Sequence, residues 1–543
     1  MPVPSADWIS NRPPWTLLTE SRVLSVMFDD IFSSTLLLAY IGLVSGYLAL
    51  RKSRSRRLPL PPGPPSYPLI GHLLSMPTSR QGRAFMDMSA QLKSDIISFS
   101  VFGTTIVVLN SNEAANDLLE KRSSIHSGRF CPPMIASPNL INMQDFVAFM
   151  STNDLWRKQR RTMGARLGKH AVTAFRASQE LEVRRLLSRF LATSKEPISS
   201  DSINEEFYRT TSAVFLESAY GYELKSGDDP FFTDILNMNN ILSHASLPTA
   251  FLVNAFPWME HIPDWVPGTA WKQKAYKWRE LKDRAMNDVY NWAKERVLRG
   301  GDDSSIVALT YKELRAMGWS EEDTDDYCKN TATGLLAAGT ETSTLAMMWF
   351  VVAMAMYPEI QERAQREIDA VVGTDRLPTV TDRPDLHFVE RLMTEVIRWH
   401  PSAPLGVPHV CTEENEYRGY RIPKGAIMIG HIFATVRDER VYQDADEFNP
   451  DRYLDPEVPR PLQAFGWGLR KCPGQHFFWE IFFLEVALIL ATLKIERCKD
   501  ENGNEIVPTQ ETTANSAISM PAPFKVRIVP RTEQHAELIR TGA

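Results

Sequence analysis

The chain has few cysteines for its length, with five among 543 residues. Their odd number and wide spacing do not fit a disulfide framework and favour a reducing compartment. It also lacks the glycine-rich loops of dinucleotide-binding and Walker A modules, so no nucleotide-binding module is expected. The net charge of -6 gives no support to nucleic-acid binding. Internal repeats and long low-complexity stretches are absent as well.

Charged residues are missing from residues 31–50, an apolar run of 20 residues. Such a run is long enough to cross a hydrocarbon core of about 30 Å. Asp29 and Asp30 precede it, and five basic residues follow between 51 and 57. The positive-inside rule therefore predicts a single transmembrane helix, with residues 1–30 outside or in a lumen and the remainder in the cytosol. A cleaved signal peptide is the alternative, but its basic residues should precede the apolar run.

Residues 51–65 form a basic, proline-rich hinge, and its prolines predict a stiff spacer between anchor and body. The body, 66–531, reads as one large domain that is mainly α with small β-sheets. A hairpin is expected over 95–110, turning near 102–104, and a helix over 358–372, closed by Gly373. A turn at 423–425 should join two short strands. The polar tail, 532–543, is expected to be loose.

The segment 465–474 (Phe-Gly-Trp-Gly-Leu-Arg-Lys-Cys-Pro-Gly) surrounds Cys472 in a way that suggests an iron ligand. Its two glycines before the cysteine allow a tight backbone turn against a flat macrocycle. The apolar run 477–493 predicts a helix, so Cys472 lies near a helix N-terminus, where the thiolate is favoured. Cys-Pro-Gly alone is more often a structural core cysteine, but the whole segment favours the ligand.

This segment resembles the haem-binding signature of the cytochrome P450 family, which it matches at Phe465, Gly468, Arg470, Cys472 and Gly474. The resemblance extends over about residues 58–531. It implies the cytochrome P450 fold, with one large haem-binding domain behind the transmembrane helix. It also implies haem b (iron protoporphyrin IX) as cofactor, with Cys472 as the axial thiolate and metal ligand. Phe465 and Gly474 would contact the haem, and Arg470 suits one of its carboxylates.

Glu395 and Arg398 stand three residues apart on a helix expected over 386–399. Alone, such a pair is usually a solvated ion pair of little value. The family resemblance adds Arg452 as a third partner. It implies that the three residues form a buried structural triad, with no part in catalysis.

Glu341 and Thr342 lie inside a long apolar stretch over 327–357, whose helix is expected to start at Ser320 with a capping box. Polar groups in such a helix need partners. The resemblance implies that these two residues deliver protons, and that Ala338 and Gly339 leave room for dioxygen and substrate. The alternative is that Thr342 hydrogen-bonds to its own helix.

Trp156 and Arg160 match the family's Trp-x-x-x-Arg element, and both can donate to a haem propionate. The resemblance places His409 at another position that often holds a propionate-binding basic residue. The neighbouring cations Arg157, Lys158 and Arg161 form either a solvated face or a docking site for an acidic electron donor.

The residues that would line the family's substrate pocket are mostly apolar, which suggests a lipophilic substrate, although each alone is more often plain core. They are Met134, Ile135, Phe146, Phe149, Leu336, Ala337, Val407, Ile518 and Met520. The aromatic segment 247–267 either dips into a membrane surface or packs between helices. The chain resembles fungal oxygenases of secondary metabolism, whose substrates include terpenoids, polyketides and indoles; a terpenoid is favoured.

Together these features predict a haem-thiolate monooxygenase anchored in the endoplasmic reticulum membrane with its catalytic domain in the cytosol. It would use dioxygen, a lipophilic substrate and electrons from an NADPH-dependent cytochrome P450 reductase, with no nucleic-acid partner. Two alternatives stay open. A redox-neutral haem-thiolate isomerase or dehydratase would use the same cysteine without dioxygen, and a non-catalytic haem protein would need no proton-delivery pair.

Overall fold

The computed structural model describes residues 58–542, except 226, 247–249, 303 and 514–517. The chain divides into two compact units. The larger comprises Pro61–Glu416 and Ile422–Ala543; of the smaller, the described residues are 58–60 and 417–421. Within the smaller unit the backbone N–H of Arg421 donates to the Pro59 carbonyl. The predicted lumenal segment 1–30, the transmembrane helix 31–50 and hinge residues 51–57 lie outside the described residues.

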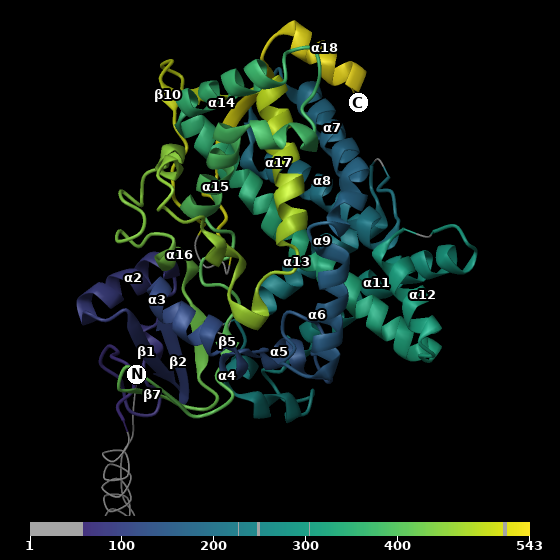
Figure 1. Cartoon of the computed structure of the whole chain (residues 1–543). Coiled ribbons are helices and arrows are strands. Elements are labelled where there is room, and N and C mark those ends of the chain that lie inside the picture. Colours follow the sequence, from purple (N-terminus) through teal and green to yellow (C-terminus); the bar gives the residue numbers. More distant parts are fainter. Residues whose placement is uncertain (1–57, 226, 247–249, 303, 514–517, 543) are drawn as a thin grey trace, which may run out of the picture. The chain divides into compact units, whose positions relative to one another are not determined.

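Helices dominate the larger unit, which confirms the predicted fold class (Figure 1). The α-helices are α2 (Gln81–Leu92), α3 (Asn112–Ala115), α4 (Ser123–His126), α5 (Pro133–Ala136), α6 (Asp154–Leu167), α7 (Arg176–Thr193), α8 (Ser200–Tyr220), α9 (Pro230–Ala245), α10 (Leu252–Ala255), α11 (Ala270–Leu298), α12 (Ile306–Ala316), α13 (Glu321–Met356), α14 (Pro358–Val371), α15 (His387–Trp399), α16 (Ile432–Thr435), α17 (Gln475–Thr492) and α18 (Glu533–Gly542). Short 3-10 or π segments are η1 (Leu73–Ser75), η2 (Asn116–Lys121), η3 (Ala171–Phe175), η4 (Pro257–His261), η5 (Val380–Asp385), η6 (Pro450–Leu454), η7 (Leu462–Phe465) and η8 (Gly468–Arg470).

Three small sheets complete the fold. One has the strand order β1-β2-β8-β5-β3, the second β10-β9-β11-β4, and the third pairs β6 with β7. The strands are β1 (Ile96–Val101), β2 (Thr104–Leu109), β3 (Gly128–Arg129), β4 (Ile198–Ser199), β5 (His409–Val410), β6 (Asn415–Tyr417), β7 (Tyr420–Ile422), β8 (Ile427–Gly430), β9 (Leu493–Lys499), β10 (Glu505–Ile506) and β11 (Lys525–Pro530).

The local signals read from the sequence appear where expected. β1 and β2 form the predicted hairpin, and Phe102 and Gly103 at its turn have positive φ values of 48° and 85°. Gly373 follows α14 with φ 88°, as expected of a helix-terminating glycine. The Ser320 side chain accepts from the Asp323 N–H at 3.0 Å and caps α13.

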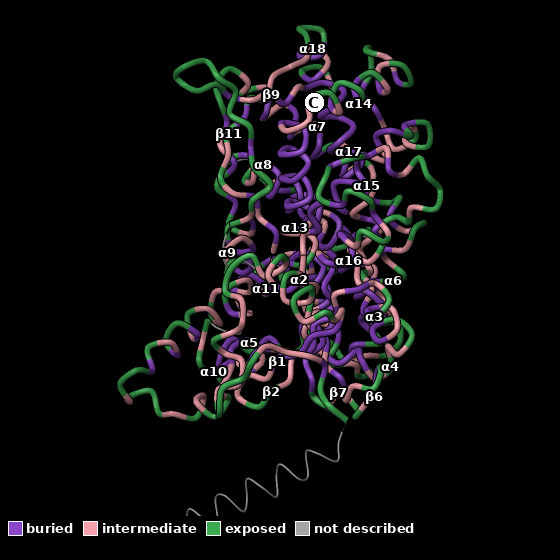
Figure 2. The backbone as a smooth tube through the Cα atoms, turned by 90° about the vertical axis from the view of Figure 1, so that its left-hand side faces the viewer, coloured by how far each residue is buried: buried purple, intermediate pink, exposed green. Residues whose placement is uncertain are grey.

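α13 and α17 form the centre of the larger unit. α13 packs against α8, α15 and α17, and α17 also contacts α7 and α14. Figure 2 shows their backbones largely buried. Both are apolar and long enough to cross a bilayer, but 78% of the most apolar stretch of each is buried inside the protein. They are core helices, as expected for the apolar stretch of α13.

The C-terminal tail differs from the expectation of a loose segment. Residues 533–542 form the helix α18, which packs against α7, α17 and β11. His535, Ala536 and Ile539 are buried on one face, three and four residues apart. The mostly polar composition of residues 532–543 suggested a loose tail. Its narrow apolar stripe is nevertheless sufficient to pack the helix against the protein.

Candidate active site

The loop before α17 holds Cys472 in a closed turn. The Cys472 N–H donates to the Phe465 carbonyl at 2.7 Å. Gly466 and Gly468 both have positive φ, at 80° and 52°. A Cβ on Gly468 would lie 2.5 Å from the Leu119 carbonyl oxygen, so no larger residue fits there. The Phe465 ring itself packs against Phe478 and Trp479 at the start of α17.

Protein atoms surround the Cys472 thiol closely enough to desolvate it, yet the residue keeps an exposed surface. Burial raises the pKa of this thiol, while the Gly474 N–H and the cation of Arg160 act in the opposite direction. Because burial raises its pKa, this thiol loses its proton readily only if a further positive charge stabilises the thiolate. A metal ion bound to the sulfur supplies such a charge and deprotonates the thiol.

Three arginines gather beside the cysteine loop. Arg470 donates to the carbonyls of Ser127 at 2.8 Å and Met150 at 2.7 Å, and Arg160 donates to the Lys471 carbonyl. Arg129, on β3, donates to the carbonyls of Val407 and Pro408.

Among the described residues no acidic side chain pairs with these three arginines, and their charges repel one another. Burial lowers the pKa of Arg470 to about 9, with Arg160 contributing. Burial also lowers the pKa of Arg129, and Arg470 and Arg160 lower it further. Such a set is suited to bind an anion that carries more than one carboxylate.

Two buried donors in this cluster have no hydrogen-bond partner among the described residues, namely Trp156 Nε1 and Arg129 Nε. The Trp156 ring is 4% exposed, with the Arg470 guanidinium 4.3 Å from its centre. Unpaired buried donors are costly unless a ligand satisfies them. The accessible thiol, the arginines and these donors together fit a haem group with its propionates. Arg129 was missed by the sequence reasoning.

His409 is less suited to the propionate role expected for it. It is buried on β5, opposite Arg129 of β3, and its Nδ1 lies 2.7 Å from the His126 carbonyl. Because a carbonyl only accepts, Nδ1 carries the proton. Burial and the cation of Arg129 lower the pKa of His409 well below its usual range. In the neutral ring Nε2 is then an acceptor and cannot donate to a carboxylate.

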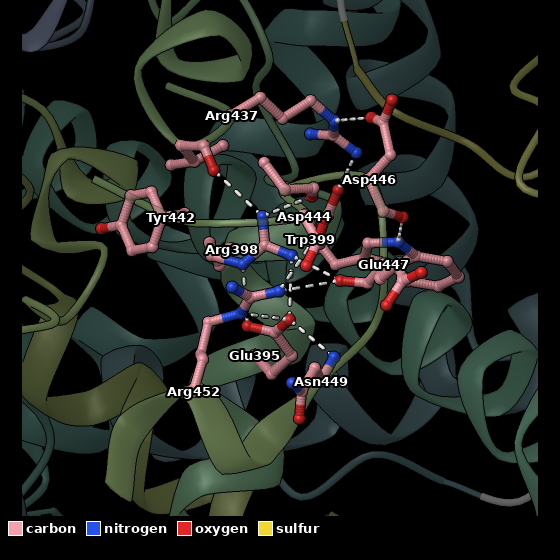
Figure 3. A network of polar contacts seen from close by, with 12 residues as sticks. Glu395, Arg398, Trp399, Arg437, Tyr442, Asp444, Asp446, Glu447, Asn449 and Arg452 are labelled. Carbon is pink, nitrogen blue, oxygen red and sulfur yellow. Dashed lines mark hydrogen bonds and ion pairs between the residues drawn. The ribbon is translucent and has the colours of Figure 1, made fainter. Parts of the chain in front are cut away.

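Glu395, Arg398 and Arg452 form a buried network, shown in Figure 3. Arg398 donates twice to the Glu395 carboxylate at 2.8 Å, and Arg452 Nε donates to it at 2.9 Å. The guanidinium groups also donate to backbone carbonyls, among them those of Val436, Ala445, Glu447 and Gln443. Burial by itself would lower the pKa of Arg398, but the Glu395 carboxylate overcomes this and raises it. The network ties α15 to the segment before η6.

On α13, the side chain of Ala338 is exposed although this helix is buried over most of its length. Glu341 and Thr342 are partly exposed one turn later. The Ser243 hydroxyl is 3.3 Å from both Glu341 carboxylate oxygens. Burial raises the pKa of Glu341, and the Ser243 hydrogen bond opposes this.

Thr342 Oγ1 donates to the Ala338 carbonyl at 2.9 Å, and Ser402 donates to the Thr342 carbonyl at 2.8 Å. The bond to Ala338 is the local one that the sequence left open as an alternative, and α13 is continuous through this turn. Thr342 therefore has a resting partner and must rotate to serve another group.

Gly339 does not provide the open space expected of it. A Cβ at this position would lie 2.0 Å from the Phe215 ring. Gly339 thus admits the aromatic side chain of α8, which stacks on Phe477 of α17 at 4.8 Å. Only Ala338 remains as the small residue that faces an accessible space.

Several residues expected to line a substrate pocket share one apolar cluster. Met134, Ile135, Phe146 and Ala337 are buried in it, and Phe149 packs against it. Leu336 belongs to the neighbouring cluster around α8. Val407 is 40% exposed, and Ile518 and Met520 are half-buried beside an undescribed segment. Only this first group, Met134, Ile135, Phe146, Ala337 and Phe149, shares one apolar cluster.

Comparison with known proteins identifies the class. Residues 61–527 match the family described as Cytochrome P450. A "Cytochrome P450 monooxygenase claR" from Ampulloclitocybe clavipes is 34% identical over 507 residues, covering 92% of this chain and 91% of that protein. "Cytochrome P450 monooxygenase 98" from Postia placenta is 35% identical, covering 91% and 94%. A "Tryptamine 4-monooxygenase" from Psilocybe cyanescens is 32% identical, covering 89% and 95%.

The chain therefore belongs to the cytochrome P450 family, whose members bind haem b through a cysteine thiolate. It is accordingly a monooxygenase that uses dioxygen, a small-molecule substrate and electrons from a redox partner.

Proposed function

We propose that Cys472 is the axial ligand of the haem and that the enzyme oxidises an uncharged lipophilic molecule, with a terpenoid favoured. The observation that supports this best is the Cys472 thiol. It is exposed, it is held in a turn closed by its own N–H, and it lies beside arginines that have no acidic partner among the described residues.

In this proposal the haem supplies dioxygen activation when it is bound, and the protein positions it. Arg129, Arg160, Arg470 and Trp156 hold its carboxylates, and Gly474 aims its N–H at the thiolate. Phe465 and Gly468 fix the turn of the cysteine loop. The Glu395 network holds the segment that follows α15 and has no chemical step of its own.

Glu341 and Thr342 supply protons. Because its pKa is raised, Glu341 retains its proton at higher pH than a solvated carboxyl does. The hydroxyl of Thr342, the next residue on α13, can turn from the Ala338 carbonyl to pass that proton inward. Retention of this pair favours monooxygenation over a redox-neutral isomerisation.

The substrate assignment is supported by the apolar cluster of Met134, Ile135, Phe146 and Phe149. An amine substrate such as that in the name of the Psilocybe cyanescens relative is best bound by an ionised carboxylate. Burial raises the pKa of Glu341, which makes it a weaker counter-ion for an amine than a solvated carboxyl is, and this supports an uncharged substrate.

We place residues 31–50 in the endoplasmic reticulum membrane, with an NADPH-dependent reductase as electron donor. The exposed tryptophans Trp258 and Trp265, 63% and 83% exposed, suit a membrane surface. Arg157, Lys158 and Arg161 are exposed on α6 and suit an acidic reductase.

Replacing the proposed ligand tests this assignment. Cys472→Ser should abolish the red-shifted absorption band of the reduced carbon monoxide complex, because that band requires a thiolate on the iron. Cys131→Ser, which alters another free cysteine of the same chain, should leave the band unchanged. An intact band in Cys472→Ser would refute the ligand assignment.

The substrate class is tested with microsomes that contain the chain and a reductase, incubated with terpenes, neutral aromatics and tryptamine. Products with one atom from labelled dioxygen are expected from the neutral compounds. Preferential oxidation of tryptamine would refute the uncharged class. Products without label would favour an isomerase.

A further inference from the structure

Helix α9 contacts one turn of α13 through two polar side chains. Asn239 and Ser243 stand four residues apart on α9, and Ala337 and Glu341 stand four apart on α13. Asn239 Nδ2 donates to the Ala337 carbonyl at 3.4 Å, and the Ser243 hydroxyl lies 3.3 Å from each Glu341 oxygen. Both contacts therefore repeat every four residues, which places one turn of α9 directly beside the turn of α13 that carries Glu341.

A tyrosine of α8 completes this polar group. Asn239 also donates to the Tyr208 hydroxyl at 2.8 Å, and both side chains are buried. Burial raises the pKa of Tyr208, and the Glu341 charge raises it further, so this hydroxyl remains protonated. His244, the next residue on α9, is exposed and packs against Trp278 of α11. Of these neighbouring polar side chains, Ser243 is the one that hydrogen-bonds to the Glu341 carboxyl.

The same helix contributes to the apolar cluster assigned to the substrate. Met238, Ile241 and Ala245 are buried in it together with Met134 and Phe146. Helix α9 therefore contacts the apolar cluster through Met238, Ile241 and Ala245, and it contacts Glu341 through the Ser243 hydroxyl.

We propose that Ser243 is a positioning residue that holds the Glu341 carboxyl for proton delivery, so that α9 fixes the acid from the side of the substrate cluster. This inference rests on the proposed role of Glu341. In each delivery Glu341 gives up one proton and takes one back from water, while Ser243 keeps its own proton throughout.

The first test follows the Glu341 carboxyl itself. In the full-length, haem-loaded protein, the infrared carbonyl band that disappears in Glu341→Gln is titrated with pH. Ser243→Ala should move the midpoint of this band upward, since the carboxylate loses a donor. Ser243→Thr should restore it. Thr233→Ala, which removes a hydroxyl of α9 that donates to the Asp229 carbonyl at 3.2 Å, should leave the midpoint unchanged.

The second test measures hydrogen peroxide released per NADPH with reductase and no added substrate. Ser243→Ala should increase release by about fivefold, the factor expected from one lost hydrogen bond. It should also shift the pH profile upward in parallel with the infrared midpoint.

An unchanged infrared midpoint in Ser243→Ala overturns the inference, whatever the peroxide yield. A shifted midpoint with unchanged peroxide release also overturns it, because the contact would then have no part in proton delivery. Failure of the proposed function is seen separately, as a wild-type protein without the red-shifted carbon monoxide band.

Discussion

At the scale of single residues, Arg129 is a buried cation close to Arg160 and Arg470. Its neighbours, Gly128 and Phe130, form no motif, and its partners Arg160 and Arg470 are far away along the chain. The three cations come from β3, α6 and the cysteine loop, and the folded chain places them close enough to lower the pKa of Arg129. The Arg129 Nε is buried without a hydrogen-bond partner among the described residues, so it is free to donate to a ligand. No sequence pattern predicts this.

At this scale we expect Arg129→Gln to speed the loss of haem by about tenfold, since one charge-assisted hydrogen bond is removed. The rate is measured as haem transfer to an excess of apomyoglobin.

Arg157→Gln is the matched control, because Arg157 is exposed on α6 and forms an ion pair with Asp154, away from the cysteine loop. It should not change the rate. We expect His409→Gln to have a smaller effect than Arg129→Gln. If His409→Gln speeds haem loss more than Arg129→Gln does, His409 binds a propionate after all.

At the scale of elements, α15 is tied to the segment before η6 by one fully buried carboxylate. Glu395→Gln should lower the free energy of unfolding by about 3–5 kcal/mol, because Arg398 and Arg452 lose the charge that compensates their burial. Denaturant unfolding monitored by circular dichroism measures the change.

Glu362→Gln on the neighbouring α14 is the control. This side chain is exposed, and its replacement should change stability by less than about 0.5 kcal/mol. A similar small loss in Glu395→Gln would contradict a structural role for the triad.

Elements with strong local signals could be predicted, and elements held by tertiary contacts could not. The Ser320 cap, the Phe102-Gly103 turn and Gly373 each fix a boundary by local chemistry, and the structure confirms them. α18 was missed because its apolar stripe is short. Gly339 was misjudged because its neighbour Phe215 comes from a helix more than a hundred residues earlier. The cysteine motif predicted the loop, but not the arginine cluster around it.

At the scale of the whole molecule, we expect residues 1–50 to account for firm membrane attachment. Deleting them should convert binding that resists carbonate washing into binding that carbonate removes, because exposed side chains such as Trp258 and Trp265 would give only peripheral contact. Fractionation of cells expressing both forms measures this. A truncated chain that still resists carbonate would contradict the proposed anchor.

The cysteine loop joins parts of the chain that are made at very different times. The Gly468 N–H donates to Glu120, 348 residues earlier, and Arg470 reaches the Ser127 carbonyl, 343 residues earlier. During synthesis these contacts of Glu120 and Ser127 cannot form until the last fifth of the polypeptide has been made. A nascent chain that ends before residue 465 lacks the proposed ligand Cys472, so we expect firm haem binding only late in synthesis.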